Sequence, residues 1–326
     1  MSSLAASQVE AAVPSDDRIS SHARLLSTQL QSMRERFFPP EAQKELRRFS
    51  IGEVSRLVSV SDSHLRALSL EQIGPSPEIQ ANGRRLYSLA QIGELRKYLA
   101  EARPKDAKSF LPWRGEGERL QTLACVNFKG GSAKTTTTLY LAQWLALQGY
   151  RVLAVDLDPQ ASLSAMFGIQ PEFDLRWGDT LYGAIRYDDK RKPLRDIIRK
   201  TYFHGLDLVP GNLELMEFEH ETPSMLSSPQ RADGGMFFER VGHALASVQE
   251  DYDLVVIDCP PALGLLTVNA LVASTHLLIP IQSSYFALEG TDDLLETIEK
   301  VRSRANPALR IIGVLITMHD RRTALA

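Results

Sequence analysis

The first part of the chain carries apolar residues at the spacing of an α-helix. From Ile19 onward the apolar positions alternate in steps of four and three residues, and Pro39 and Pro40 end the pattern. This heptad spacing predicts a helix that either packs on its own domain or pairs with a second copy of itself in a dimer. The apolar positions are Ile19, Ala23, Leu26, Leu30, Met33 and Phe37.

The next helical pattern, from Phe49 to Leu68, divides into two short helices. Ser59 interrupts the apolar spacing, and Ser61 is a residue of the kind that caps the start of a new helix. Two such helices in succession resemble a helix-turn-helix, whose second helix can enter the major groove of DNA. The side chains predicted to face DNA from this helix are Ser63, His64 and Arg66.

A hairpin is predicted after the two helices. Asn82 and Gly83 form the strongest short hairpin signal, and apolar residues flank them on both sides. Arg84 and Arg85 beside this turn add positive charge that could meet DNA phosphates. The order of two helices, hairpin and a closing helix from Leu89 resembles the winged DNA-binding domain of MerR-like regulators.

From Leu120 onward the apolar residues occur in short continuous runs separated by amphipathic stretches. Apolar runs without alternation are typical of parallel strands that are buried on both faces. The predicted fold class is therefore α/β, with a mainly parallel sheet covered by helices. The expected strands are residues 122–126, 152–155, 206–209, 254–257, 277–281 and 311–316.

These patterns divide the chain into five segments. Residues 1–17 are rich in Ser, Ala and Asp and are predicted to be a mobile leader. Residues 18–40 hold the N-terminal helix with its possible dimerisation role, and residues 41–102 hold the winged helix-turn-helix. Residues 103–119 are polar, with prolines and glycines, and are predicted to be a linker. Residues 120–326 form the α/β domain.

Composition and charge narrow the class of protein. Hydrophobic residues make up 44% of the chain and charged residues 24%, which is the balance of a soluble globular protein. The sequence lacks a run of roughly eighteen apolar residues and a secretory signal, so a cytoplasmic protein is expected. The net charge is −3, but between Arg47 and Arg114 there are twelve Lys or Arg and seven Asp or Glu. This local excess fits either a phosphate-facing surface or a solvated basic one.

The clearest chemical signal is a phosphate loop after the first strand of the α/β domain. Glycines let backbone amides cradle phosphate oxygens, and the following helix N-terminus and Lys134 add positive charge. Thr135 is placed to ligate Mg²⁺. Phe128 and Ala133 stand where an ordinary loop has its first and last glycines. The residues predicted to bind the nucleotide are Lys129, Gly130, Gly131, Ser132, Ala133, Lys134, Thr135 and Thr136.

Lys129, at the head of this loop, resembles the signature lysine of the deviant Walker A motif in the ParA/MinD family of ATPases. Asp156 and Asp158, at the end of the second expected strand, resemble the second motif of the family, and Asp258 resembles its Walker B carboxylate. The resemblance covers residues 120–322. It implies a P-loop NTPase fold behind the winged domain, with ATP and Mg²⁺ as cofactors.

The resemblance also implies a role for individual residues. One lysine would reach the nucleotide across a dimer, one carboxylate would hold the attacking water, and others would support magnesium. The catalytic set is Lys129, Lys134 and Asp158, the magnesium set is Thr135, Asp156 and Asp258, and Asn269 is a further nucleotide contact.

A winged module joined to this ATPase is similar to the large partition ATPases of the repABC plasmid systems. This resemblance implies weak ATP hydrolysis that DNA and a partner stimulate. It also implies a homodimer that binds operator and non-specific DNA, associates with the nucleoid and represses its own operon. The implied partner is a ParB-like centromere-binding protein. The alternative is a nucleotide-switched transcriptional repressor without motor activity.

Two further expectations concern the C-terminal part of the chain. Relatives of this kind continue beyond Ala326, so the ATPase domain is expected to be truncated at its C-terminus. A membrane role of the MinD kind is not expected, because the sequence ends without an amphipathic C-terminal helix.

Overall fold

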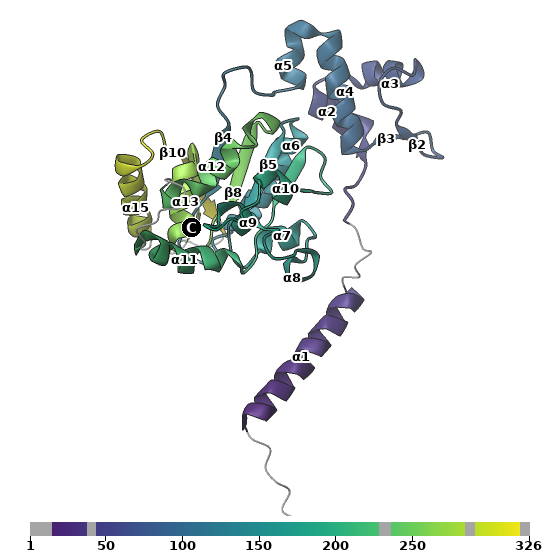
Figure 1. The fold of residues 1–326 in the computed structure, drawn as a ribbon. Helices are drawn as coiled ribbons and strands as arrows, with labels where there is room; N and C mark the ends of the chain where they lie inside the picture. The colour runs from purple at the N-terminus through teal and green to yellow at the C-terminus, as the bar shows by residue number, and fades with distance from the viewer. Residues whose placement is uncertain (1–14, 38–43, 228–235, 284–290, 320–326) are drawn as a thin grey trace, which may run out of the picture. The chain divides into compact units, whose positions relative to one another are not determined.

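A computed structural model describes residues 15–37, 44–227, 236–283 and 291–319 (Figure 1). The chain divides into two compact units, Met1–Lys44 and Glu45–Ala326. Most of the predicted leader, the prolines expected to end the first helix and the last seven residues lie outside the described ranges. Within these ranges, no helix is both long and apolar enough to cross a membrane.

The first unit is built on one helix, α1 (Ser15–Phe37). It covers the residues whose heptad spacing predicts a helix. Within that apolar stripe Ile19, Leu26, Leu30 and Met33 lie exposed, with Ile19 at 67% and Leu30 at 65%. The stripe is therefore available for contact with another surface.

The second unit begins with a small module of helices and short strands. Ser59, with φ of 54°, ends the first helix in the left-handed conformation, and the hydroxyl of Ser61 accepts a hydrogen bond from the backbone N–H of His64 to begin the second. The hairpin turns at Gly83, with φ of 77°. The module consists of β1 (Phe49–Ser50), α2 (Ile51–Val58), α3 (Asp62–Leu70), β2 (Glu78–Ile79), β3 (Arg85–Tyr87) and α4 (Leu89–Ala102).

Strand β1 adds a feature that the apolar pattern did not indicate. It pairs antiparallel with β3, which also pairs antiparallel with β2, so the hairpin becomes a three-stranded sheet in the order β1-β3-β2. Because β1 is two residues long, it leaves no readable alternation in the sequence.

The stretch predicted to be a linker contains local structure of its own. A 3-10 turn, η1 (Pro104–Asp106), leads into the short helix α5 (Ala107–Phe110), and Phe110 is buried. Beyond it, the indole N–H of Trp113 donates to the carbonyl of Gly149 at 3.0 Å. The segment therefore contacts the folded part of the chain through Phe110 and Trp113.

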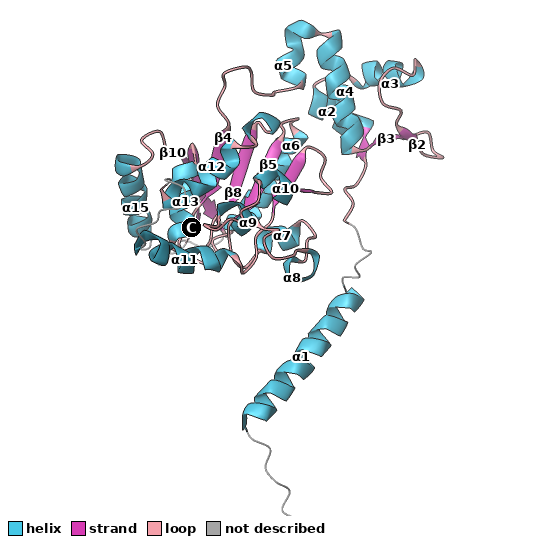
Figure 2. Cartoon of the chain, viewed as in Figure 1, coloured by secondary structure: helices cyan, strands magenta, loops and turns pink. Residues whose placement is uncertain are grey.

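A seven-stranded sheet forms the centre of the α/β domain (Figure 2). Its strand order is β10-β9-β4-β8-β5-β7-β6, and every pairing is parallel except that of β6 with β7. Each of the six predicted strands is present, and the two-residue edge strand β6 is additional. The strands are β4 (Gln121–Cys125), β5 (Val152–Asp156), β6 (Arg199–Lys200), β7 (Leu206–Val209), β8 (Leu254–Asp258), β9 (His276–Gln282) and β10 (Arg310–Thr317).

Helices connect these strands and cover both faces of the sheet. The longer ones are α6 (Lys134–Leu147), α11 (Leu215–Ser227), α13 (Leu265–Ala273) and α15 (Thr291–Arg304). The shorter ones are α7 (Ser162–Met166), α8 (Pro171–Asp174), α9 (Leu181–Ile185), α10 (Leu194–Ile197), η2 (Phe237–Glu239), α12 (Arg240–Ala246) and η3 (Gln249–Asp251). This arrangement confirms the predicted α/β class.

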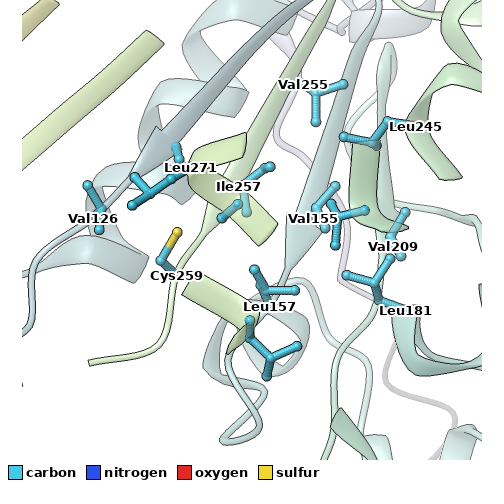
Figure 3. Close-up of a cluster of buried hydrophobic side chains, with 14 of the residues drawn as sticks. Val126, Val155, Leu157, Leu181, Val209, Leu245, Val255, Ile257, Cys259 and Leu271 are labelled. Atoms are coloured by element: carbon cyan, nitrogen blue, oxygen red, sulfur yellow. The ribbon is translucent and has the colours of Figure 1, made fainter. Parts of the chain in front are cut away.

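Alternate residues of the strands feed two hydrophobic cores. On one face, Val155 and Ile257 pack with Leu181 and Leu245 from the helices (Figure 3). On the other face, strand residues pack with α6 and α7 in a cluster that also contains the buried side chains of the N-terminal module. The second unit therefore has a core that continues from the module into the sheet.

Candidate functional site

The central strands of the sheet deliver the predicted site residues to one edge. Strand β8 lies between β4 and β5, with Cys125 and Asp156 both in register with Asp258. Because all three strands are parallel, the loop after β4 and the carboxylates after β5 and β8 emerge together at the carboxyl edge. Open α/β sheets bind their ligands at this edge.

Side chains from neighbouring segments shape the loop between β4 and α6. The amide of Asn127 donates to the carbonyl of Pro280 at 2.6 Å and accepts from the backbone N–H of Lys129 at 2.9 Å. The amide of Gln282 donates to the carbonyl of Gly131 at 2.7 Å. These contacts use the backbone N–H of Lys129 and the carbonyl of Gly131, and they fix the conformation of the loop.

Ala133 closes the loop in a conformation that favours glycine. Its φ of 67° and ψ of 29° lie in the left-handed region, at the N-cap of α6. For an L-residue this region costs roughly 1–2 kcal/mol. Ala133 stands where an ordinary loop has glycine. It therefore keeps the left-handed turn, and this adds local backbone strain.

Lys134 begins α6 and is drawn inward toward the carboxylates. Its side chain is 6% exposed, and its ammonium donates to the carbonyl of Lys129 at 3.2 Å. Burial lowers the pKa of Lys134, while attraction to Asp258 and Asp158 acts in the opposite direction. A cation that is partly desolvated next to an open loop is suited to binding an anion.

Asp258 is one of two buried carboxylates at the centre of the site. It is fully buried, and burial together with the neighbouring Asp156 raises its pKa to about 8, although a hydrogen bond from Thr135 opposes the shift. The hydroxyl of Thr138 lies 3.5 Å from its Oδ1. Its Oδ2 belongs to the few buried side-chain atoms of the described residues that have no hydrogen-bond partner.

Asp156 is also fully buried, but its oxygens are occupied. The backbone N–H and the hydroxyl of Ser164 both donate to its Oδ2 at 2.7 Å, and the backbone N–H of Asp158 donates to its Oδ1 at 3.3 Å. Burial raises the pKa of Asp156 to about 7, against the hydrogen bonds from Ser164. This carboxylate holds the strand end in place and orients the segment that carries Asp158.

Asp158 lies closer to the surface than the other two carboxylates. Its side chain is 9% exposed, and its Oδ1 accepts the backbone N–H of Gln160 at 2.9 Å. Lys134 and Thr135 thus both lie close enough to Asp258 to lower its pKa, and Asp158 lies nearer the surface. Lys129 lies half-buried at the head of the loop.

The residues present fit a polyanion with a hard cation. The unpartnered Oδ2 of Asp258 and the unpartnered hydroxyl of Ser132 are buried beside the loop, where a ligand would satisfy them. In the part of the chain that is described, no three His, Cys, Asp or Glu side chains gather as a metal cage. Mg²⁺ does not require such a cage, because it binds through one or two carboxylates, water and substrate phosphates.

Asn269, the further nucleotide contact expected from the resemblance, lies elsewhere. It is buried on α13, where its amide accepts from the backbone N–H of Val241 and donates to the carbonyl of Leu265. Both ends of the amide are thus engaged within the helical layer.

The residues predicted to bind DNA gather partly around one cleft of the N-terminal module. A cleft of about 330 Å³ is lined by Arg66 of α3 and by Arg84 and Arg85 of the hairpin. The guanidinium of Arg85 donates to the hydroxyl of Ser69 at 3.1 Å. Ser63 and His64 are not among the lining residues, and the His64 ring lies 3.4 Å from the guanidinium of Arg103.

Comparison with known proteins places this site in a family. Residues 120–311 match the family described as AAA domain. A protein bearing the name replication protein A in Sinorhizobium fredii is 51% identical over 82% of this chain, which spans 65% of that protein's length. The sporulation initiation inhibitor protein Soj of Bacillus subtilis is 41% identical over 62% of this chain and 74% of its own. The chain belongs to the ParA/Soj family.

A solved structure is similar to the α/β domain of this chain. The crystal structure of cobyrinic acid a,c-diamide synthase from Mycobacterium smegmatis with bound ATP analog and magnesium has a TM-score of 0.55 and 34% identity, over 63% of this chain and 77% of that one. The shared part is the P-loop fold.

Three residues beside the candidate site were given no role from the sequence. Asn127 and Gln282 hold the loop by its carbonyl and N–H groups, and Ser164 satisfies Asp156. Asn127 and Gln282 each lie at the end of a predicted strand, a position that can signal a site. Ser164 had no local signal, because its role depends on a tertiary contact.

Proposed function

We propose that this chain is an ATP-hydrolysing plasmid partition protein that uses ATP and Mg²⁺. The observation that carries the proposal is the buried, unpartnered oxygen of Asp258 beside Thr135 and Lys134. A desolvated carboxylate and a desolvated ammonium face the same open loop, and MgATP would neutralise both. Membership of the ParA/Soj family supports this choice of ligand.

The residues of the chain divide the work of binding. Backbone amides of Gly130 to Thr136 cradle the phosphates, and Lys134 pairs with their negative charge. Thr135 and Asp258 would hold Mg²⁺, and the bound ion would supply positive charge that stabilises the phosphates. Asp156 acts through its contact with Ser164, which keeps the segment after β5 in place.

The hydrolytic step depends on positioning. Asp158, near the surface of the site, orients the attacking water, and positioned charges rather than covalent chemistry lower the barrier. Lys129 reaches the nucleotide of a second copy of the chain, so the active form is a homodimer. We assign Lys129 a catalytic role because it lies at the head of the loop.

Turnover measurements test the enzymatic proposal. We expect Lys134→Ala and Asp158→Ala to lower ATP turnover with Mg²⁺ by on the order of 100-fold or more, and chelation of Mg²⁺ to abolish it. Asp189→Ala, which removes an exposed carboxylate, is the matched control and leaves turnover unchanged. Asp158→Ala retaining nucleotide binding and full turnover would remove Asp158 from the mechanism.

The N-terminal module supplies the DNA-binding part of the proposal. Ser63, His64 and Arg66 of α3 face the major groove, and Arg84 and Arg85 contact phosphates from the hairpin. Through this module the protein binds its operator and represses its own operon. In the cytoplasm it also binds nucleoid DNA without sequence preference and works with a ParB-like centromere-binding protein.

Salt dependence of DNA binding tests this part. The slope of log affinity against log salt is negative, and each phosphate contact that is lost lowers its magnitude by about 0.9. We expect this change for Arg84→Ala and for Arg85→Ala, and no change for Arg56→Ala, an exposed arginine of α2. If nucleotide and DNA bind but DNA and partner produce no turnover, the nucleotide-switched repressor is the better description.

A further inference from the structure

Arg96 of α4 is a buried cation that joins several segments of the second unit. Its side chain is 3% exposed. One terminal nitrogen donates to the carbonyl of Phe110 at 3.0 Å, and the other donates to the carbonyls of Leu57 at 2.6 Å and Leu147 at 2.9 Å. The described partners of this guanidinium are therefore three backbone carbonyls.

These carbonyls share a structural position. Leu57 lies in the last turn of α2, Phe110 is the last residue of α5 and Leu147 is the last residue of α6. The final carbonyls of a helix have no partner within it and carry partial negative charge. Arg96 therefore compensates three helix ends at once. Burial lowers the pKa of Arg96 to about 10, so a cation held without a carboxylate depends on these contacts.

The helix that ends at Leu147 begins in the phosphate loop. Helix α6 runs from Lys134 to Leu147, so its first residue belongs to the nucleotide site and its last contacts Arg96. A helix of this length spans about 20 Å and moves largely as a rigid rod. A displacement at its first turn is therefore delivered to the carbonyl of Leu147.

Arg96 makes close contacts with its neighbours and also lines a cavity of about 560 Å³, together with Gly93, Gly149 and His204. Gly149, with φ of +99°, lies so near that a Cβ there would be 3.0 Å from Cδ of Arg96. A Cβ on Gly93, one turn earlier on α4, would lie 2.9 Å from Nε2 of His204. The hydrophobic cluster of this face contains Leu95 and Leu99 of α4 together with Ala146 of α6.

We propose that Arg96 is a positioning residue that passes the nucleotide state of the phosphate loop to the N-terminal module. Nucleotide binding shifts the first turn of α6, α6 carries the shift to its last carbonyl, and Arg96 passes it to the ends of α2 and α5. Helix α2 packs directly on α3, so the change reaches the predicted DNA-facing helix. The inference rests on the proposed function only in taking MgATP as the ligand.

Hydrogen exchange of the full chain, with and without Mg²⁺ and the ATP analogue AMPPNP, tests the inference without DNA. In the wild type we expect exchange to slow several-fold both at residues 134–147 and at residues 51–58 and 89–102. Arg96→Met keeps the slowing at 134–147 and loses it in the module. Lys97→Met, an exposed neighbour on the same helix, behaves as the wild type.

The inference is wrong if folded Arg96→Met still transmits the change to the module. It is also wrong if the wild type responds only at residues 134–147. A wild type that shows no response at 134–147 contradicts the proposed nucleotide site, which separates the two failures.

Arg96→Lys is a second test that applies if Arg96→Met does not fold. It keeps the buried cation, but one ammonium lacks the planar fork that spans three carbonyls. We expect nucleotide protection at 134–147 to persist and the response of the module to fall by at least half. A response of the module equal to that of the wild type would contradict the proposed role of Arg96.

Discussion

At the scale of single residues, sequence motifs predict some parts of the candidate site and miss others. The loop and the carboxylates after β5 and β8 could be predicted, because glycine, lysine and aspartate at strand ends have few other uses. In the structure, Lys134 and Thr135 both lower the pKa of Asp258. Ser164 could not be found in this way, since a serine becomes a partner of Asp156 only when the chain folds.

Ala133 allows a prediction at this scale. Because its backbone is left-handed, Ala133→Gly relieves strain, and we expect the free energy of unfolding to rise by about 1 kcal/mol. Urea denaturation followed by circular dichroism measures the change. The same substitution at Ala142, buried in the middle of α6, is expected to lower the free energy of unfolding by about 1 kcal/mol or more. Equal signs for the two variants would contradict this explanation.

At the scale of helices and strands, apolar runs predict most of the strands of the sheet. Polar contacts then join neighbouring segments. Short, mainly apolar runs identified six of the seven strands of the sheet, whereas the two-residue strands β1 and β6 carry no periodic signal. Asp253, just before β8, provides a junction that no run predicts. It accepts backbone N–H groups of Arg114 and Arg151 at 2.8 Å and the guanidinium of Arg151 at 2.7 Å.

Removal of this buried carboxylate leaves several donors without an acceptor. We expect Asp253→Asn to lower the free energy of unfolding by about 3 kcal/mol. Asp251→Asn, which breaks the exposed pair with Arg195, is expected to cost less than about 1 kcal/mol. Chemical denaturation of both variants compares them directly, and similar losses would contradict the importance of burial.

The same carboxylate predicts a pH dependence. Burial would raise the pKa of Asp253, but hydrogen bonds from Arg151 and from the backbone N–H of Arg114 outweigh it and lower the pKa. A depressed pKa in the folded state means that its stabilisation is complete above the ordinary pKa of 3.8 and is lost as pH falls below it. Asp253→Asn should therefore lose less stability on acidification than the wild type, as melting at stepped pH would show.

The whole molecule raises the question of how two copies associate. The predicted heptad helix exists as α1 with its apolar stripe exposed, which favours a dimer without nucleotide. Lys129 instead predicts contact across a nucleotide-dependent dimer. Sequence could suggest both surfaces but not choose between them, because each surface is satisfied only by a second chain.

Light scattering with and without ATP and Mg²⁺ separates the two surfaces. We expect Leu30→Asp to remove the nucleotide-free dimer, because a charge then lies in the apolar stripe, and Lys129→Ala to weaken only the nucleotide-dependent one. Arg24→Ala, an exposed change on α1, should alter neither. A wild type that is monomeric under both conditions would contradict both surfaces.

The exposed strand β10 has a practical consequence for these measurements. Ile312, Val314 and Ile316 are each more than half exposed on it. A row of apolar side chains on a sheet strand attracts any apolar solute as well as neighbouring chains. Folded preparations should therefore bind hydrophobic reporter dyes and lose solubility as they are concentrated. Melting curves read from such dyes would start at high fluorescence, so intrinsic tryptophan emission or circular dichroism is the appropriate signal for this protein.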